Sequence, residues 1–361
     1  MNIRDLFNRE RPIGIDITNE AIILVEMSKK KGELELVNLG MAPTPVGAVR
    51  DGEIVDPTQV AATIQEIMAV EGFKCRKAIT AVSGQAAIIR TIKFPAMSPK
   101  ELREVVLAEA ERYIPFAVSD VNLDFQALAT VEEDGAQKTE VLLVAAQKQL
   151  ISSYLEAITV AGLELVAVDV ASFAVARALG PAMDSPEPVV LVLIRGETTD
   201  INVMKDGVPR FSRSIPIGSA TFAQVIATGL NVSLEEAIAI HDRLVLPVAG
   251  AEPSDDPLVE QAATEIRSTL RELTTEIQRS LEYFHQSQGV EKIGHAILSG
   301  RGAKMKHLDK HLATYLGLNV EIGNPVGFRF DETRYPAEFL VEQAPILATA
   351  IGLARRGVEG T

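Results

Sequence analysis

The sequence predicts an α/β protein of two related lobes, with an α+β unit inserted in the first lobe and a helical cap on the second. Three short apolar strands separated by polar turns open the chain, and the same pattern returns after residue 188. The segment 180–188 between the two halves is rich in Pro and polar residues, which is typical of a domain boundary. The length of 361 residues leaves room for two or three domains.

The first lobe begins with strands expected at 13–17, 21–27 and 34–39, which form a β-meander because only short polar turns separate them. A helix follows. It starts at Asp56-Pro57-Thr58, ends at Gly72, and carries an apolar face from Val60 to Met68 that packs on a sheet. A strand at 78–82 completes this part, and we assign 1–84 and 161–186 to the core of the first lobe.

The inserted unit follows a different pattern of strands and helices. We expect strands at 86–94, 121–128 and 140–146, a helix from Ser98 to about Arg112, and a second helix that ends at Gly162. This mixture interrupts the meander, so 85–160 is interpreted as an α+β insertion. A strand at 163–170 and a helix at 172–179 then return to the first lobe.

The second lobe repeats the meander with strands expected at 189–194, 200–205 and 208–214. Helices then start near Ser219 and Ser233, and a long one covers 257–286, so 220–290 is predicted to be the helical cap. A strand at 292–298, a helix to Leu316 and a last helix at 345–355 complete the lobe core, which is expected to comprise 187–219 and 291–361.

Composition excludes several classes of function. The chain has 49 acidic and 35 basic residues, and its net charge of -14 disfavours binding to nucleic acid. One cysteine, Cys75, excludes an internal disulfide and a Cys-rich zinc site and fits a reducing compartment. No apolar run approaches the roughly 18 residues that a membrane-spanning helix needs, and no signal peptide is present. We expect a cytoplasmic protein with only peripheral membrane contact.

Two meander-led halves, each with a polar hairpin turn after its first strand, resemble the actin-like ATPase superfamily, which includes actin, FtsA and sugar kinases. The resemblance narrows to the FtsA-related PilM family of type IV pilus inner-membrane assembly proteins. It is carried by GIDI at 14–17, GEIVDP at 52–57, ERYIPF at 111–116, NLDF at 122–125, EVLLVAA at 140–146 and AGL at 161–163. The insertion at 85–160 takes the place of an FtsA-type subdomain.

The resemblance implies a site for ATP or ADP with Mg²⁺ between the lobes. Hairpin turns offer backbone N–H groups and hydroxyls to phosphate oxygens, and an aspartate at a strand end orders the water around the metal ion. No catalytic residue is assigned, and the metal residue is Asp16. The full implied set is Asp16, Thr18, Asn19 and Glu20 in the first turn, Gly196, Glu197, Thr198 and Thr199 in the second, and Glu276, Arg279, Ser280, Gly300, Arg301 and Gly302 for adenosine.

The phosphate turns depart from the family pattern. Thr18 and Arg195 stand where glycine is expected, and Ile23 stands where lysine is frequent. Leu193 replaces a second aspartate, and Arg301 replaces the central glycine of the adenosine turn. These departures favour nucleotide binding over repeated ATP hydrolysis. Three alternatives stay open: a metal-free strand-end carboxylate at Asp16, an ordinary β-hairpin at 198–199, and a solvated ion pair between Glu276 and Arg279.

The resemblance also implies a function as an adaptor. PilM-like proteins bind the cytoplasmic N-terminal peptide of PilN in a groove between the first lobe and the inserted subdomain. Such a peptide holds a protein at the inner face of the inner membrane, and nucleotide could alter its affinity by changing lobe closure. Other inner-membrane and motor components of the pilus are expected partners, and homo-oligomerisation is left open by the sequence.

Two other functions remain as alternatives. An FtsA-type cell-division protein would carry a C-terminal amphipathic membrane helix, whereas the tail at 355–361 is short and polar. A sugar or acetate kinase would need an aspartate base near the γ-phosphate, for which Asp169 and Asp200 are the candidates.

Three further motifs have simpler interpretations. His307 and His311 are expected on an exposed helical face and not at a metal. The segment 1–11 has the spacing of a short membrane-surface helix, but a docked or frayed terminus is favoured. Tyr113 and Phe116 are expected in the core, with a place near the partner groove as the alternative.

Overall fold

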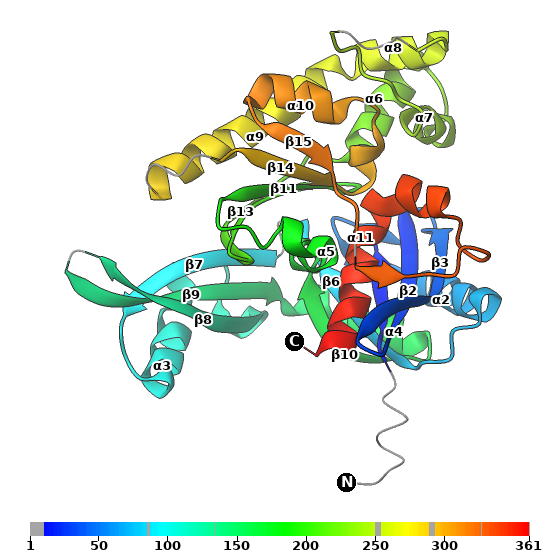
Figure 1. The fold of residues 1–361 in the computed structure, drawn as a ribbon. Coiled ribbons are helices and arrows are strands. Elements are labelled where there is room, and N and C mark those ends of the chain that lie inside the picture. The colour runs from blue at the N-terminus through cyan, green and yellow to red at the C-terminus, as the bar shows by residue number, and fades with distance from the viewer. Residues whose placement is uncertain are drawn as a thin grey trace.

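The computed structural model describes residues 11–84, 87–133, 135–249, 254–288, 293–325 and 327–360. Figure 1 shows two large sheets, one in each lobe, with the inserted unit extending from the first lobe and the helical cap on the second. Of the segment 1–11, for which a docked or frayed terminus was predicted, residues 1–10 lie outside the described residues.

The first lobe is a six-stranded sheet covered by helices on both faces. Its strands are β1 (Ile13–Ile17), β2 (Ala21–Lys30), β3 (Glu33–Pro43), β6 (Lys77–Val82), β10 (Glu164–Val170) and β16 (Phe328–Arg329), in the order β10-β6-β1-β2-β3-β16. The predicted meander is confirmed as β1 to β3, which pair antiparallel, while β6 and β10 add in parallel. A short hairpin, β4 (Val49–Arg50) with β5 (Glu53–Ile54), follows the meander.

Alternation along β1 and β2 directs side chains into two separate cores. Ile13 and Ile15 are fully buried with residues of α2 (Pro57–Glu71) and α4 (Lys148–Val160). Ile23 and Val25 point to the other face, where α5 (Ala171–Leu179) and α11 (Ala337–Glu359) contribute the buried side chains. The predicted helix after Asp56 is confirmed, with the Asp56 side chain accepting a hydrogen bond from the Gln59 backbone.

The inserted unit is a three-stranded antiparallel sheet with one helix. Its strands are β7 (Ala87–Pro95), β8 (Val121–Glu133) and β9 (Ala136–Gln147) in the order β7-β9-β8, its helix is α3 (Pro99–Glu109), and single turns η2 (Ala110–Arg112) and η3 (Val118–Asp120) precede β8. Ser98 and Glu101 form a reciprocal cap at the start of α3. The helix α4, which the sequence placed in this unit, buries Leu150 and Tyr154 in the core of the first lobe.

The second lobe has a five-stranded sheet in the order β13-β12-β11-β14-β15. Its strands are β11 (Val189–Ile194), β12 (Thr199–Lys205), β13 (Val208–Ile215), β14 (His295–Ser299) and β15 (Asn319–Ile322), flanked by η4 (Gly180–Ala182), η5 (Arg301–Lys304) and α10 (Leu308–Leu316). The cap comprises α6 (Ser219–Leu230), α7 (Leu234–His241), α8 (Pro257–Glu265) and α9 (Arg267–Gln288). The single helix predicted at 257–286 is therefore two helices, because the backbone at Ile266 has a ψ of -6° while its side chain stays buried.

The C-terminal segment returns to the first lobe, although the sequence placed 291–361 with the second. β16 pairs with β3, and α11 packs against β1, β2 and α5 (Figure 1). The backbones of α11 and β1 lie so close together that a Cβ atom on Gly14 would be 2.3 Å from the Ala350 carbonyl oxygen. The predicted start at Pro345 is inside α11. By length and composition α11 could span a bilayer, but it is largely buried, as in the core helix of a globular protein.

Candidate functional site between the lobes

The first of the two predicted phosphate turns joins β1 to β2 and is held by its own threonine. The Thr18 hydroxyl accepts hydrogen bonds from the backbone N–H groups of Glu20 (3.2 Å) and Ala21 (2.9 Å), and it donates to the Ala21 carbonyl (3.0 Å). These bonds form a local side-chain turn of the kind that Ser and Thr favour. Thr18 therefore replaces the expected glycine without a left-handed backbone, because its φ is not positive.

The second turn joins β11 to β12 and touches the first. A Cβ atom on Gly196 would lie 1.8 Å from the Asn19 side-chain oxygen, so any other residue at 196 would require the Asn19 side chain to move. The Arg195 N–H donates to the Thr198 carbonyl (2.8 Å) and closes the hairpin. The Thr199 hydroxyl donates to the Ile217 carbonyl (2.6 Å) inside the second lobe, so Thr198 is the hydroxyl that faces the space between the lobes.

A buried ion pair joins the two turns. The Arg195 guanidinium donates to both carboxylate oxygens of Asp16, at 2.8 and 3.4 Å, and it also reaches the Ile17 carbonyl (3.5 Å) and the Thr349 hydroxyl (3.4 Å). The side chains of Arg195 and Asp16 are 8% and 4% exposed. Burial opposes the charged form of Arg195, but the charge and the hydrogen bonds of Asp16, together with smaller contributions from its neighbours, outweigh burial and raise the pKa of Arg195.

A second polar network crosses between the lobes beside this pair. The Glu20 carboxylate accepts a hydrogen bond from the Ser219 hydroxyl (2.8 Å) and lies 3.8 Å from Arg301. Arg301 in turn forms a two-pronged ion pair with Asp242, at 2.6 and 3.1 Å. Burial raises the pKa of Glu20, with Arg301 and Ser219 opposing it. The two lobes are thus held together by charged contacts from both turns.

A cavity of about 560 Å³, here called the interlobe cavity, opens beside the two turns. Thr18, Asn19, Arg195, Gly196 and Thr198 line one side of it. The rest of the described lining includes Gly52, Ser83, Gly84, Pro115, Phe116, Gln147, Tyr154 and the carboxylates of Asp51, Glu53 and Glu197. Five of the eight predicted turn residues therefore line one cavity, in which Arg195 supplies positive charge against several acids. The other three, Asp16, Glu20 and Thr199, are not among its described lining residues.

The predicted magnesium site is not matched by its residues. Asp16 is the carboxylate that the sequence assigns to the metal, and the structure gives both of its oxygens to Arg195. Leu193 lies buried where a second acid would be required. Among the described residues no cluster of three metal-ligating side chains is found. A divalent cation prefers several oxygen ligands, which this arrangement does not supply.

The predicted adenosine residues on α9 form their contacts within the second lobe. Gly300 and Arg301 instead line a small hollow together with Asp16 and Glu20 of the first turn. On α9, Glu276 pairs with Arg279 (2.6 Å) and with Arg213 of β13 (2.6 Å), and Ser280 accepts a hydrogen bond from Arg213 (3.1 Å). Hydrogen bonds from Arg279 are the main reason that the pKa of Glu276 is lowered. These residues join the cap to the sheet, and none is among the described residues that line the cavity.

The glycine turn at 300–302 packs on the strand β11. A Cβ atom on Gly300 would lie 2.2 Å from the Ile194 carbonyl oxygen, and one on Gly302 would lie 2.2 Å from the Ile194 side chain. Arg301, between them, contacts Asp242 at the end of α7. The structure therefore brings α7 to this turn, a contact that the sequence interpretation missed because Asp242 follows the helix and has no motif of its own.

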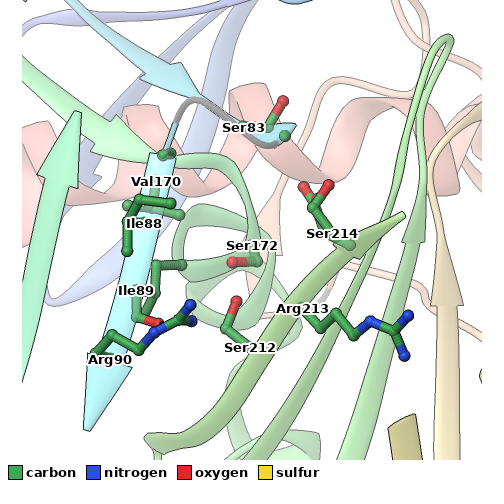
Figure 2. A pocket seen from close by; sticks show the side chains of 12 residues that line it. Ser83, Ile88, Ile89, Arg90, Val170, Ser172, Ser212, Arg213 and Ser214 are labelled. Carbon is green, nitrogen blue, oxygen red and sulfur yellow. The ribbon is translucent and has the colours of Figure 1, made fainter. Parts of the chain in front are cut away.

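A second and smaller pocket of about 220 Å³ lies between the insertion and the second lobe. Figure 2 shows the hydroxyl groups of Ser172 and Ser212 turned toward the same space beside β7. Asp200 also lines it, and burial raises the pKa of this carboxyl. The other candidate base, Asp169, is engaged by Arg177 (3.1 Å) and Arg356 (2.9 Å). Neither aspartate is among the described residues that line the interlobe cavity, so the kinase alternative gains no support.

A third hollow of about 700 Å³, here called the insertion groove, separates the inserted unit from the first lobe. The open edge of β8 forms one wall, and the end of β10 with α5 forms the other. Phe173 and Val144 line its floor, with Arg177 and Arg356 at one side. The remaining described lining is Val82, Asn122, Leu123, Asp124, Phe125, Gln126, Leu142, Ala146, Ile151, Val168, Asp169 and Val170. The NLDF segment of the sequence thus lies on this groove.

The other motifs have ordinary places in the fold. Tyr113 packs edge-on against Phe94 in the core of the inserted unit, while Phe116 reaches the interlobe cavity. His311 lies 3.4 Å from the Thr274 hydroxyl and stacks on Tyr315. His307 contacts the Leu246 carbonyl (3.2 Å), so the two histidines have separate partners. The predicted exposed helical face is wrong, because His307 precedes α10 and both histidines are partly buried.

The fold and sequence are similar to those of known proteins. Residues 14–358 match the family described as type IV pilus assembly protein PilM. The solved PilM–PilN type IV pilus biogenesis complex contains a chain 31% identical, with a TM-score of 0.84, and the match covers 97% of this chain and 99% of that one.

More distant solved structures share the fold alone. The ethanolamine utilization protein EutJ from Carboxydothermus hydrogenoformans is 17% identical with a TM-score of 0.57, covering 95% of this chain and 88% of that one. MreB5 of Spiroplasma citri bound to AMPPNP is 13% identical with a TM-score of 0.52, covering 95% of each chain. The predicted actin-like fold is confirmed, and the chain belongs to the PilM family of type IV pilus assembly proteins.

Proposed function

We propose that this chain is an adaptor in type IV pilus assembly that binds the cytoplasmic N-terminal peptide of PilN in the insertion groove. The similar chain of known structure was solved in a complex with PilN. Family membership supports the pathway, and the groove supports the mode of binding. The observation that carries the proposal is a hollow of about 700 Å³ bounded by two open strand edges.

The groove has the chemistry that an extended peptide requires. β8 pairs only with β9, and β10 pairs only with β6, so among the described strands each has one unpaired edge. Such an edge offers main-chain N–H and C=O groups to an added strand, and neighbouring pockets select its side chains. Phe173 and Val144 provide apolar contacts for alternate side chains of the peptide.

This binding mode would place the protein in the cytoplasm at the inner face of the inner membrane. PilN would supply the attachment, and the remaining surface would be free for cytoplasmic motor components. The net charge of -14 argues against direct adsorption to anionic lipid, so attachment through a partner is the simpler route.

The interlobe cavity is proposed to take ATP or ADP, with its phosphates near Arg195, Asn19 and Thr198. Nucleotide would influence peptide affinity if it changed the position of the first lobe relative to the second. A ligand shifts a conformational equilibrium only when it binds the two conformations with different affinities, and this holds for the nucleotide and for the peptide. Mg²⁺ is left out of this proposal, because Asp16 is the partner of Arg195.

The test is a titration of the full chain with a fluorescently labelled PilN N-terminal peptide, read by anisotropy. Phe173→Ala removes an aromatic contact from the groove floor and is expected to weaken binding about tenfold, which corresponds to roughly 1.4 kcal/mol. Phe339→Ala is the matched control. Phe339 is 36% exposed near the start of α11, whereas Arg356 near the other end of that helix reaches the groove.

The control variant should bind like the unmodified chain, and circular dichroism should show both variants folded. Equal affinity of the Phe173→Ala variant and the unmodified chain would place the peptide elsewhere. No peptide binding by the unmodified chain would refute the proposed function.

A further inference from the structure

The interlobe site has an unusual source of positive charge. Actin-like sites are expected to use a metal ion, yet the cation beside Asp16 here is part of the chain. Arg195 directs two N–H groups at the carboxylate and another contact at the Ile17 carbonyl, so it meets the end of β1 as a coordinated ion would. Arginine suits this role because it stays charged when buried and binds carboxylate with a planar fork.

The neighbours of Arg195 are arranged around an arginine. Thr349 on α11 accepts from its Nη1 atom (3.4 Å), and Asp200 adds a favourable charge interaction at longer range. The position across the cleft is the apolar Leu193, which is 1% exposed. Asp16 is therefore the carboxylate that pairs with this guanidinium, and a divalent ion in the same place would be repelled by Arg195.

The two lobes meet through this pair. Asp16 ends β1 of the first lobe and Arg195 follows β11 of the second, and the Glu20–Ser219 hydrogen bond lies close by. The close approach of Asn19 and Gly196 shows that the two turns contact each other directly. Charge neutralisation across the cleft is thus provided by the protein.

We infer that Arg195 takes the place of a divalent metal in this site, so that Asp16 is the counter-ion of an arginine and closure of the lobes needs no metal. The inference that nucleotide in the interlobe cavity is bound without Mg²⁺ rests on the proposed function. The part that concerns lobe closure rests on the ion pair alone.

The experiment compares the full chain in EDTA and in excess MgCl₂. Thermal unfolding is followed by circular dichroism without nucleotide, and ATP binding is followed by calorimetry in both buffers. We expect the same Tm and the same Kd for ATP in each. A Tm or an ATP affinity that rises with Mg²⁺ in the unmodified chain would overturn the inference.

Arg195→Gly supplies the residue expected in relatives and leaves Asp16 without its cation. Its Tm is expected to be lower in EDTA and to rise when MgCl₂ is added, whereas Arg195→Lys keeps the charge and should remain insensitive to the metal. The matched control is Arg210→Gly, which removes another ion pair between the second lobe and the insertion, with Glu140. That variant should show no response to Mg²⁺.

The Tm and ATP-binding measurements distinguish a failure of this inference from a failure of the proposed function. If ATP binds in neither buffer, the nucleotide proposal fails, but the Tm comparison still decides whether closure needs a metal. An Arg195→Gly variant that folds and shows no metal response would count against Arg195 as a substitute for the ion. If that variant does not fold even in MgCl₂, the Arg195→Lys result decides: metal-insensitive folding supports the inference, and metal-dependent folding overturns it.

Discussion

The pair between Arg195 and Asp16 offers a quantitative test of how the lobes are held together. Both side chains are more than nine-tenths buried, so solvent screening is weak and breaking the pair leaves a charge inside the protein. Removal of one partner of a buried pair typically costs about 3–5 kcal/mol. We expect Arg195→Met and Asp16→Asn each to lower the free energy of unfolding by about that amount.

The double variant should lose no more than either single one, because it contains neither unpaired charge. That result corresponds to a coupling energy of about 3 kcal/mol in a double-mutant cycle. Urea unfolding should be followed by far-UV circular dichroism, because the chain contains no tryptophan. The exposed pair between Arg329 and Glu33 is a control, and Arg329→Met should change stability by less than about 0.5 kcal/mol. Additive single effects, or single effects as small as the control, would refute the reasoning.

Three further predictions concern packing, pH and a hydrogen bond. Gly14→Val should lower the free energy of unfolding by about 3 kcal/mol or more, measured in urea, because its Cβ would lie 2.3 Å from the Ala350 carbonyl oxygen. Burial raises the pKa of Asp242, but hydrogen bonds from neighbouring groups outweigh it and bring the pKa to about 2. The ionised Asp242 carboxylate therefore stabilises the fold above its unfolded pKa of 3.8, and this contribution is lost as the pH falls toward 2. In the Asp242→Asn variant the urea midpoint should therefore decrease less over that pH range than in the unmodified chain. Tyr154→Phe removes the hydrogen bond to the Gly52 carbonyl (2.9 Å) and should cost about 1 kcal/mol in the same unfolding assay, whereas a change near zero would show that this bond contributes no net stability.

The repeated meander was predictable because alternating apolar residues and short polar turns leave few other arrangements. The strands at 13–17 and 189–194 and the cap of α3 at Ser98 follow from such local signals. The start of α11 was missed, because Pro345 inside the helix was interpreted as its first turn. β16 was missed because Phe328 and Arg329 form a strand only by pairing with β3.

The candidate site was also only partly predictable from the sequence. The two hairpin turns were singled out from the sequence, and Thr18, Asn19, Gly196 and Thr198 do meet at one cavity. The ion pair that joins the turns was not predictable, because Arg195 and Asp16 lie 179 positions apart and pattern alone marked Arg195 only as a departure. For the predicted adenosine residues on α9 the helical spacing is correct, but the structure pairs them with Arg213 on a strand distant in sequence.

The insertion groove is the proposed binding site of the PilN peptide. Hydrogen exchange of the full chain, with and without the peptide, tests it directly, because an added strand protects the edge it pairs with. We expect slower exchange at 122–126 of β8 and at 168–173, where β10 meets α5. Protection confined to the edge of β15, or to the interlobe turns at 18–20 and 196–199, would contradict the assignment of the groove.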